Sequence, residues 1–526
     1  MTTRTVRDVT LEVLRRYGMT TIFGNPGSTE ISFLANLPED LTFVLALHEG
    51  SVVGLATGWA LGHGRPAVAL LHTTAGFGNA VSALATARVN KAPLVVIVGQ
   101  QDRRHLASEP FLAGHLEGLA GTYPVWVGTP ARATDLPGAI ARAHNEAIIG
   151  RGPAIVIAPM NDWDEDFEEI PLPSPRVLRL ASGIDAEAGR DILDRLARSD
   201  NPVLIAGAGC DDQRTWSALA RLAERLACPV WQEAFGSRAG FPQHQERFAG
   251  HLPAGRGALR ETLDGHDLVL VFGAPSLRQY GYEPGSLYPD GVDVVVVTAD
   301  AAEAAISTAD VAWVAPLAPL VEYLADEVMA RPPRGRTVAP HVPPPAPALG
   351  GALTTRDVFQ ALASRLPEST ILFEEVPSAR HLMLELLPTR MPLGFLGPAM
   401  GGLGFALPAA AGVRMALPDR PVVALVGDGS SLYNIQALWS AEHYRVGVLY
   451  IVLSNGGYAI MDRLAAAAGS APAWPPFDVR VHDLATAFGC EAREVTTFAE
   501  LSRELDAVVP TLLTRSRPLL LNVRVA

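Results

Sequence analysis

The sequence has 526 residues, of which 48% are apolar and 18% charged, a balance that excludes intrinsic disorder and favours several packed domains. Its 42 Lys and Arg residues against 55 Asp and Glu residues leave a net charge of −13, which argues against a nucleic-acid binder. The opening residues lack the apolar stretch of a signal peptide, and no run approaches the ~20 apolar residues of a membrane span, so we expect no membrane association. Three scattered cysteines fit neither a disulfide framework nor a zinc site, which favours a reducing cytoplasm.

Residues 1–180 are expected to form a first unit in which helices alternate with short apolar strands. The opening helix repeats valine at helical spacing and is expected to end at Gly18. Nearly uninterrupted apolar strands follow at TFVLAL, AVALLH, PLVVIVG and AIVIAP. Strands of this kind are buried on both faces, which is typical of parallel sheets covered by helices.

A second unit is expected over 183–330 and a third over 352–526, both with the same alternation of helix and strand. Between them, residues 331–351 are so rich in proline that we expect an extended linker. The segment TVRDV at Thr5–Val9 recurs as TTRDV at Thr354–Val358, at the first helix of its unit in each case. The predicted fold class is therefore α/β, with three Rossmann-like units on parallel sheets and a relationship between the first and third.

One stretch of the third unit combines a glycine turn with polar side chains. A buried strand ends in Gly427–Ser430, and a helix follows at once, so the turn offers unpaired N–H groups to a phosphate. The next strand ends at Asn455, followed by two glycines. Because neighbouring strand ends lie side by side in a parallel sheet, Asp428 and Asn455 present two oxygens to one point, as Mg²⁺ prefers. The simpler alternative is a strand, turn and helix with an Asp and an Asn as caps.

This spacing, GDG and then an Asn about 27 residues later, resembles the cofactor motif of thiamine diphosphate enzymes. The family's paired asparagines read Ser454-Asn455 here, so the first one is missing. The resemblance implies a pyrimidine-binding first unit, a central unit and a diphosphate-binding third unit. It also implies that Asp428, Asn455 and the carbonyl of Gly457 hold Mg²⁺, and that further cofactor contacts come from Ser378, Gly401, Leu403, Gly429, Ser430 and Tyr458. In that family a residue like Leu403 keeps the cofactor bent, although ordinary helix packing also explains it.

The segments FGNPGSTE at 23–30, HEG at 48–50, LLHTTAGFGNA at 70–80 and GGLGFALPAAAG at 401–412 resemble benzoylformate decarboxylases. The resemblance implies that Glu49 shares a proton with the cofactor's aminopyrimidine ring. It implies that Ser28 hydrogen-bonds the substrate carboxylate and that His72 transfers protons at the reacting carbon. Taken alone, these residues also fit a helix-start charge, a helix cap and a core histidine. The role of Asn79, as a cap or as a contact, stays open.

The middle unit departs from the family at one catalytic position. Its segment GAPSLRQYGYEPG places Tyr280 where the family has a second catalytic histidine. A phenol is a weaker acid near neutral pH than an imidazolium, so we expect slower protonation of the enamine and slower aldehyde release.

Residues aligned with the family's substrate pocket complete the predicted site. Gly397 replaces an aromatic ring and is expected to enlarge the cavity, which favours an aromatic or long-chain 2-oxo acid. Residues of this kind are also typical of a core. The aligned positions are Phe111, Leu112, Phe395, Gly397, Met400, Met461, Leu464 and Trp474.

We therefore expect an enzyme that uses thiamine diphosphate and Mg²⁺ to convert a 2-oxo acid to an aldehyde and CO₂. A carboligase or lyase acting on 2-hydroxy ketones is the alternative that Tyr280 favours. A flavin or nicotinamide oxidoreductase would rest on the glycine turn at Leu204–Gly209, which lacks the third glycine of the dinucleotide fingerprint. The resemblance implies a small-molecule 2-oxo acid or aldehyde as substrate and a homodimer at least, commonly a homotetramer.

Overall fold

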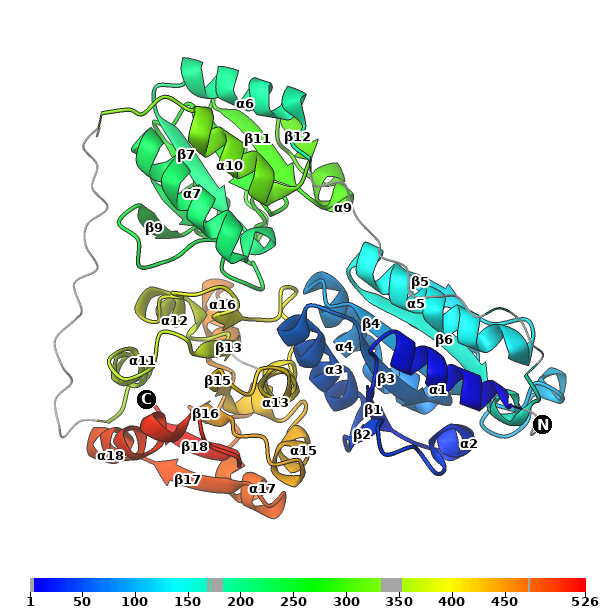
Figure 1. Ribbon diagram of the computed structural model, residues 1–526. Helices are drawn as coiled ribbons and strands as arrows, with labels where there is room; N and C mark the ends of the chain where they lie inside the picture. Colours follow the sequence, from blue (N-terminus) through cyan, green and yellow to red (C-terminus); the bar gives the residue numbers. More distant parts are fainter. Residues whose placement is uncertain (1–3, 168–170, 172–182, 333–351, 472–473) are drawn as a thin grey trace.

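A computed structural model describes residues 4–167, 171, 183–332, 352–471 and 474–526, and builds them around three six-stranded sheets (Figure 1). Each sheet lies within one of the three predicted units, which confirms the predicted α/β class. The predicted linker at 331–351 lies outside the described residues, except for its first two. No described helix combines the length and the apolar run that a bilayer crossing needs.

The first sheet is entirely parallel and has the order β2-β1-β3-β4-β6-β5. Its central strands are buried along almost their whole length, because helices cover both faces. The strands are β1 (Thr21–Asn25), β2 (Thr42–Leu45), β3 (Ala67–His72), β4 (Leu94–Gln100), β5 (Trp126–Gly128) and β6 (Pro153–Pro159). The helices are α1 (Val6–Arg16), α2 (Ile31–Leu34), α3 (Glu49–His63), α4 (Thr73–Val89) and α5 (Leu136–Gly150).

The third sheet repeats the strand order of the first, as β14-β13-β15-β16-β18-β17. The short repeat noted above opens α1 and α11 with the same capping box, Thr5 with Asp8 and Thr354 with Asp357. The strands are β13 (Ile371–Glu375), β14 (Phe395–Leu396), β15 (Val422–Gly427), β16 (Leu449–Ser454), β17 (Glu491–Val495) and β18 (Leu519–Arg524). The helices are α11 (Thr355–Ala363), α12 (Arg380–Leu386), α13 (Ala406–Ala416), α14 (Asp428–Ser431), α15 (Ala437–His443), α16 (Ala459–Ala467), α17 (Val481–Ala487) and α18 (Phe498–Val508).

The central sheet has the order β12-β11-β10-β7-β8-β9, the doubly wound order of Rossmann folds. The strands are β7 (Pro202–Ala206), β8 (Val230–Gln232), β9 (Phe248–His251), β10 (Leu268–Phe272), β11 (Asp293–Thr298) and β12 (Val311–Val314). The helices are α6 (Ala186–Arg198), α7 (Gln213–Leu226), α8 (Arg256–Leu263), α9 (Ala301–Ala305) and α10 (Leu317–Glu327).

The first and third units share one hydrophobic core, and within it α3 packs against α13 (Figure 1). Glycines let these helices meet backbone to backbone. A Cβ added to Gly58 would lie 2.0 Å from the carbonyl oxygen of Ala409, and one added to Gly412 would lie 2.1 Å from that of Leu55. Any larger side chain at either glycine would push the helices apart. Since Glu49 is the first residue of α3, this packing fixes its position relative to the third unit.

Candidate active site

Glu49 is a buried carboxylate held by two amide side chains. It begins α3, and only 8% of the residue is exposed. Asn25, at the end of β1, donates from Nδ2 to Oε1 of Glu49 over 2.9 Å, and Asn79 of α4 donates to Oε2 over 3.1 Å. A buried carboxylate without such donors would be costly, so the two amides fix its orientation. Asn79, whose role the sequence left open, therefore contacts the predicted activating acid.

His72 is held by a second buried acid, which the sequence analysis did not single out. The imidazole Nδ1 lies 2.9 Å from Oγ1 of Thr29 and 3.1 Å from Oε2 of Glu30. Glu30 is 1% exposed and also accepts the N–H of Gly27 over 2.8 Å. A proton on Nδ1 would be donated to Glu30, which leaves Nε2 available to a substrate. The only sequence signal for this acid is its place two residues after Ser28, which is itself exposed.

The structure brings Glu49 and His72 to one place across Gly76 of α4. A Cβ added to Gly76 would lie 3.2 Å from Cγ of Glu49 and 3.4 Å from Cβ of His72. A glycine here leaves room for both side chains at the same edge of the first sheet. Glu49 and His72 are therefore two predicted catalytic residues that a single chain brings together.

The predicted diphosphate and metal site is built around the Asp428 carboxylate. Asp428 follows β15 and is 5% exposed. Its Oδ1 accepts the N–H of Gly429 over 2.8 Å, and its Oδ2 accepts those of Asn455 and Gly456 over 3.0 and 2.9 Å. Burial raises the pKa of Asp428, and these three hydrogen bonds oppose that rise. The ends of β15 and β16 are thus joined through one carboxylate, as the parallel-sheet argument predicts.

The other residues predicted to contact the cofactor lie around this carboxylate. The side chain of Asn455 is exposed, and its Oδ1 accepts the N–H of Gly457 over 3.2 Å. A Cβ on Gly429 would lie 2.7 Å from the ring of Tyr458, so the Tyr458 ring packs directly on the backbone of this turn. Ser378 accepts the N–H of Ile460 over 3.0 Å and so holds the start of α16. Ser430 is buried within the short helix α14.

This donor set suits a hard, oxygen-loving cation. Asp428 still has a free lone-pair direction after its three hydrogen bonds, and the amide oxygen of Asn455 has another. One carboxylate, one amide and one carbonyl are few protein ligands, which is typical of Mg²⁺ sites completed by phosphate and water. Within the described ranges, no three His, Cys, Asp or Glu side chains gather as a metal site of their own.

The segment before α13 is held by a buried acid that the sequence analysis missed. Glu375 ends β13, is 1% exposed, and accepts the N–H groups of Gly404 and Ala406, each over 2.6 Å. Since α13 has no capping side chain of its own, Glu375 caps it from the neighbouring strand. Burial raises the pKa of Glu375 to about 8, although the N–H donors oppose this. The predicted cofactor residues Gly401 and Leu403 belong to the same segment.

Replacement of Glu375 by Gln is expected to flatten the pH dependence of stability. The carboxyl pKa rises from 4.5 to about 8 on folding. Between these values the unfolded chain releases the proton and the folded chain keeps it, so the free energy of unfolding falls as pH rises. Each pH unit in this window contributes about 1.4 kcal/mol at most. Urea unfolding across the window should show a shallower decline for Glu375→Gln, whereas Glu368→Gln, an exposed control, should follow the wild type.

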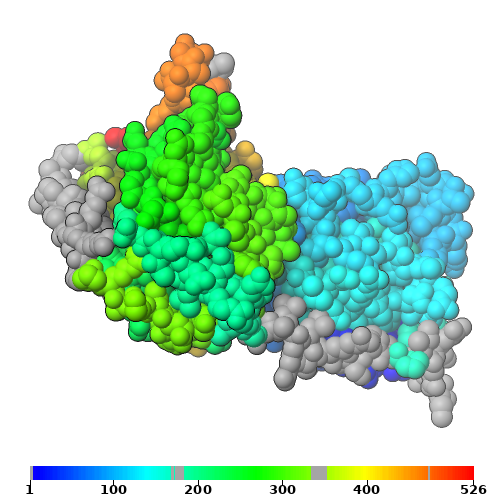
Figure 2. All heavy atoms as spheres, turned by 90° about the horizontal axis from the view of Figure 1, so that it is seen from above, coloured from blue at the N-terminus to red at the C-terminus, as the bar shows by residue number. Residues whose placement is uncertain are grey.

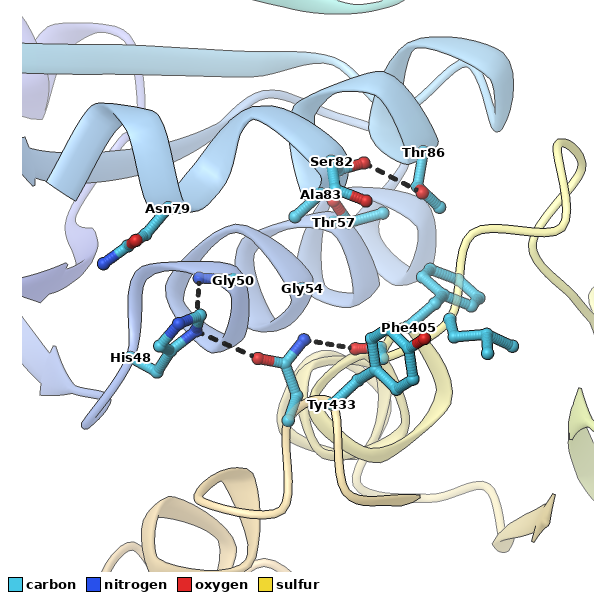
Figure 3. A pocket seen from close by; sticks show the side chains of 13 residues that line it. His48, Gly50, Gly54, Thr57, Asn79, Ser82, Ala83, Thr86, Phe405 and Tyr433 are labelled. Carbon is cyan, nitrogen blue, oxygen red and sulfur yellow. Dashed lines mark hydrogen bonds between the residues drawn. The ribbon is translucent and has the colours of Figure 1, made fainter. Parts of the chain in front are cut away.

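A cavity of about 120 Å³ lies between the first and third units, beside the start of α3 and the segment before α13 (Figure 3). His48 and Asn79 line it from the first unit, and Leu403, Phe405 and Tyr433 line it from the third. This volume lies below the roughly 300–1,000 Å³ of pockets that enclose a drug-sized ligand. The cavity of the single chain is therefore smaller than the pocket expected for a cofactor of the size of thiamine diphosphate.

Several residues predicted to line the substrate pocket are exposed in the single chain. Phe111 is 88% exposed, and α16 buries none of its residues. Tyr280, predicted as a catalytic residue, is 74% exposed. Figure 2 shows the α16 segment, in orange, projecting from the body of the molecule. Leu112 and three methionine or leucine residues of the third unit share this exposure, namely Met400, Met461 and Leu464. Trp474 is half-buried and donates from its indole N–H to Asp462. The single chain thus leaves the predicted pocket open.

The expectation that Gly397 enlarges the substrate cavity stays a prediction, and in the single chain a charged pair lies beside this glycine. A Cβ at Gly397 would lie 3.2 Å from Oε2 of Glu374 and 3.3 Å from Nη1 of Arg380. These two side chains form an ion pair with each other, and the Arg380 guanidinium also lies over the ring of Phe395, at 5.7 Å. The charged pair therefore lies against Gly397 in the single chain.

Comparison with known proteins matches all three units of this architecture. Residues 4–119 match the N-terminal TPP binding domain of thiamine pyrophosphate enzymes, 190–324 match the central domain, and 378–523 match the C-terminal TPP binding domain. The chain is 38% identical to a benzoylformate decarboxylase of Pseudomonas aeruginosa over 99% of its own length and 98% of the relative's. The chain belongs to the thiamine pyrophosphate enzyme family. Thiamine diphosphate, predicted from the spacing of Asp428 and Asn455, is the cofactor of this family.

Solved structures of thiamine pyrophosphate enzymes show the same fold over the whole chain. A 4-hydroxybenzoylformate decarboxylase of Rhodococcus jostii RHA1, dependent on thiamine diphosphate, superposes with a TM-score of 0.92 at 35% identity, and covers 99% of both chains. A benzoylformate decarboxylase of Polynucleobacter necessarius does so with a TM-score of 0.93 at 32% identity, also over 99% of each. These likenesses confirm the predicted resemblance and the three-unit fold.

The glycine turn in the central unit serves packing. A Cβ on Gly207 would lie 2.3 Å from that of Ala274, and one on Gly209 would lie 2.9 Å from Cα of Gly273. The turn after β7 is therefore filled by the turn after β10, which accounts for its glycines without a dinucleotide. This packing and the family membership disfavour the oxidoreductase alternative.

Proposed function

We propose that this member of the family decarboxylates a bulky or aromatic 2-oxo acid of the benzoylformate type to an aldehyde and CO₂, with thiamine diphosphate and Mg²⁺. The observation that carries the proposal is the pairing of the buried Glu49 with His72 across Gly76. The three relatives reported above, which cover almost the whole chain, are named for benzoylformate or 4-hydroxybenzoylformate.

When bound, thiamine diphosphate would supply a carbon nucleophile for the 2-oxo group and an electron sink for the pair left by CO₂. In this proposal Glu49 exchanges a proton with the aminopyrimidine ring, with its carboxylate oriented by Asn25 and Asn79. His72 holds or donates a proton beside the reacting carbon, with Glu30 fixing its ring. The exposed Ser28 hydroxyl hydrogen-bonds the substrate carboxylate.

The third unit binds the other end of the cofactor in this proposal. Asp428, Asn455 and the carbonyl of Gly457 hold Mg²⁺ against the diphosphate, and Leu403 supports the bent cofactor. The metal is proposed because the Asp428 carboxylate and the diphosphate are both negatively charged, and a cation between them offsets the charge of both.

A second copy of the chain completes the site in this proposal. The support comes from the exposed apolar residues on the loop at 111–112 and on α16, and from a cavity smaller than the pocket expected for the cofactor. We propose a homodimer as the minimum and a homotetramer as the common form. A cytoplasmic location is also proposed, supported by three buried cysteines that form no disulfide.

Carbon dioxide release from a panel of 2-oxo acids tests the proposed function. The apoprotein is supplied with thiamine diphosphate and Mg²⁺, singly and together. We expect benzoylformate and ring-substituted analogues to be consumed faster than pyruvate, and only when both additions are present. Failure of the whole panel with a cofactor-loaded, folded protein would contradict the proposal.

Carboligation of aldehydes is the second candidate, because the resemblance places a second catalytic histidine at the position of Tyr280. The phenol is exposed in the single chain, and its backbone N–H is held by the carbonyl of Ala254 over 3.1 Å. Without the usual acid, protonation to the aldehyde would be slower, and bond formation with an added aldehyde would compete better. The product is then a 2-hydroxy ketone.

Replacement of Tyr280 by His is expected to raise the ratio of aldehyde to 2-hydroxy ketone. A factor of ten in this ratio corresponds to about 1.4 kcal/mol between the competing transition states, which one positioned proton donor can supply. The ratio is measured at fixed aldehyde concentration, with Tyr282→His as the neighbouring exposed control. An unchanged ratio in a folded, cofactor-loaded Tyr280→His variant would mean that the proton comes from elsewhere, for instance from His72.

A further inference from the structure

Asn434 joins the first and third units through a buried amide. It lies just after α14 and is 6% exposed. Its Nδ2 donates to the carbonyl of Gly404 over 2.7 Å. On the other side, its Oδ1 accepts the hydroxyl of Ser51 over 3.2 Å and lies 3.2 Å from Nδ1 of His48. In Figure 3, dashed lines run from Gly50 through His48 to the segment that carries Tyr433, the residue before Asn434.

The contact on the third-unit side fixes the backbone next to Leu403. Gly404 has a φ of +89°, and a Cβ there would lie 2.6 Å from Nδ2 of Asn434, so the position requires glycine. Its N–H is held by Glu375 and its carbonyl by Asn434. With both polar groups of one peptide segment held, the preceding Leu403 has little freedom to move.

The contact on the first-unit side lies beside Glu49. His48 is the N-cap of α3 and accepts the N–H of Gly50, and Ser51 lies one position further along the first turn. Asn434 therefore touches the residues on both sides of the predicted activating acid. One amide is bound at once to the start of α3 and to the segment that carries Leu403.

We propose that Asn434 is a positioning residue, which sets the segment carrying Leu403 against the start of α3. The proposal rests on the proposed function, since it gives Leu403 and Glu49 their roles toward thiamine diphosphate. Its effect on the reaction passes through Leu403 and not through substrate contact. Loss of the amide leaves the carbonyl of Gly404 without its donor and frees the segment to shift.

The test compares Asn434→Ala with Leu403→Ala and with the double variant. We expect Asn434→Ala to lower kcat and to weaken thiamine diphosphate binding, measured by calorimetry, by about tenfold each. In a chain that already carries Leu403→Ala, the same change should lower kcat by no more than about twofold, because both act through one segment. Full multiplication of the two effects on kcat would overturn the proposal.

A matched control separates positioning from general loosening of the two units. Ser440 is fully buried and donates to the carbonyl of Leu45 over 3.0 Å, so it also joins the third unit to the first, but away from Gly404. Ser440→Ala should lower the melting temperature and leave kcat within about twofold of the wild type. If Ser440→Ala lowers kcat as much as Asn434→Ala does, Asn434 has only a structural role.

Two further variants keep the outcome decisive. If Asn434→Ala does not fold, Ser51→Ala removes one donor to the same amide and should lower kcat about threefold, again without further effect in the Leu403→Ala chain. No change in kcat for Ser51→Ala would then overturn the proposal.

Glu49→Gln is measured in parallel. If it keeps full turnover, the proposed function fails, whereas a slow Glu49→Gln beside a wild-type-like Asn434→Ala overturns only the role of Asn434.

Discussion

Glu49→Gln is expected to bind thiamine diphosphate and to turn over about 10²- to 10⁴-fold more slowly than the wild type. The glutamine keeps the shape of the side chain but cannot take up a proton. It also brings an NH₂ group toward the two amide donors of Asn25 and Asn79, which now meet only one acceptor. In the proposed site, cofactor affinity depends mainly on the contacts that Asp428 and its neighbours make with the diphosphate. These contacts do not involve Glu49, so the affinity should change much less than kcat.

Steady-state kinetics and calorimetry on the same preparation check this prediction. Glu39, an exposed acid of the same unit, supplies the control, and Glu39→Gln should match the wild type in both measurements. Glu49→Asp keeps the proton-accepting group but withdraws it from the ring, so an intermediate rate is expected. Near wild-type turnover by Glu49→Gln would show that this carboxylate does not activate the cofactor.

Most interior strands of the fold could be predicted from the sequence, but the interior strand β1 and several edge strands could not. Interior strands such as β4 and β6 are apolar at nearly every position because helices cover both faces of the sheet. By contrast, β17 has the sequence EAREV and is exposed at most positions, so it carries no apolar signal. An edge strand is recognised by its partner, here β18, and not by its own composition.

The site was predictable where chemistry follows a fixed spacing along the chain. Asp428 and Asn455 follow the ends of two neighbouring strands. The number of residues between them is typical of the family's cofactor motif, so both could be recognised from the sequence. The groups that orient the site were missed because they come from distant parts of the chain. Glu30 meets His72, and Asn434 meets Ser51, only after the sheets form and pack. The contact of Glu374 and Arg380 with Gly397 depends in the same way on tertiary packing.

Asp428→Ala is expected to weaken thiamine diphosphate binding by at least about a hundredfold at low Mg²⁺, with partial recovery as Mg²⁺ is raised. The variant removes the only charged oxygen of the proposed metal site and leaves the diphosphate charge poorly neutralised. High Mg²⁺ compensates by mass action, since Asn455 and Gly457 still offer two oxygens. Calorimetric titration of the cofactor at several Mg²⁺ concentrations measures the effect, with the exposed Asp419→Ala as control.

The same carboxylate also has a structural role, which must be separated from the metal. Asp428 accepts three backbone N–H groups, so its loss leaves the ends of β15 and β16 less well joined and should lower the melting temperature of the cofactor-free protein. Asp428→Asn keeps part of this hydrogen bonding but not the charge. If the role is metal binding, Asp428→Asn recovers melting temperature more than cofactor affinity. If both recover together without any dependence on Mg²⁺, Asp428 is a structural residue and the metal lies elsewhere.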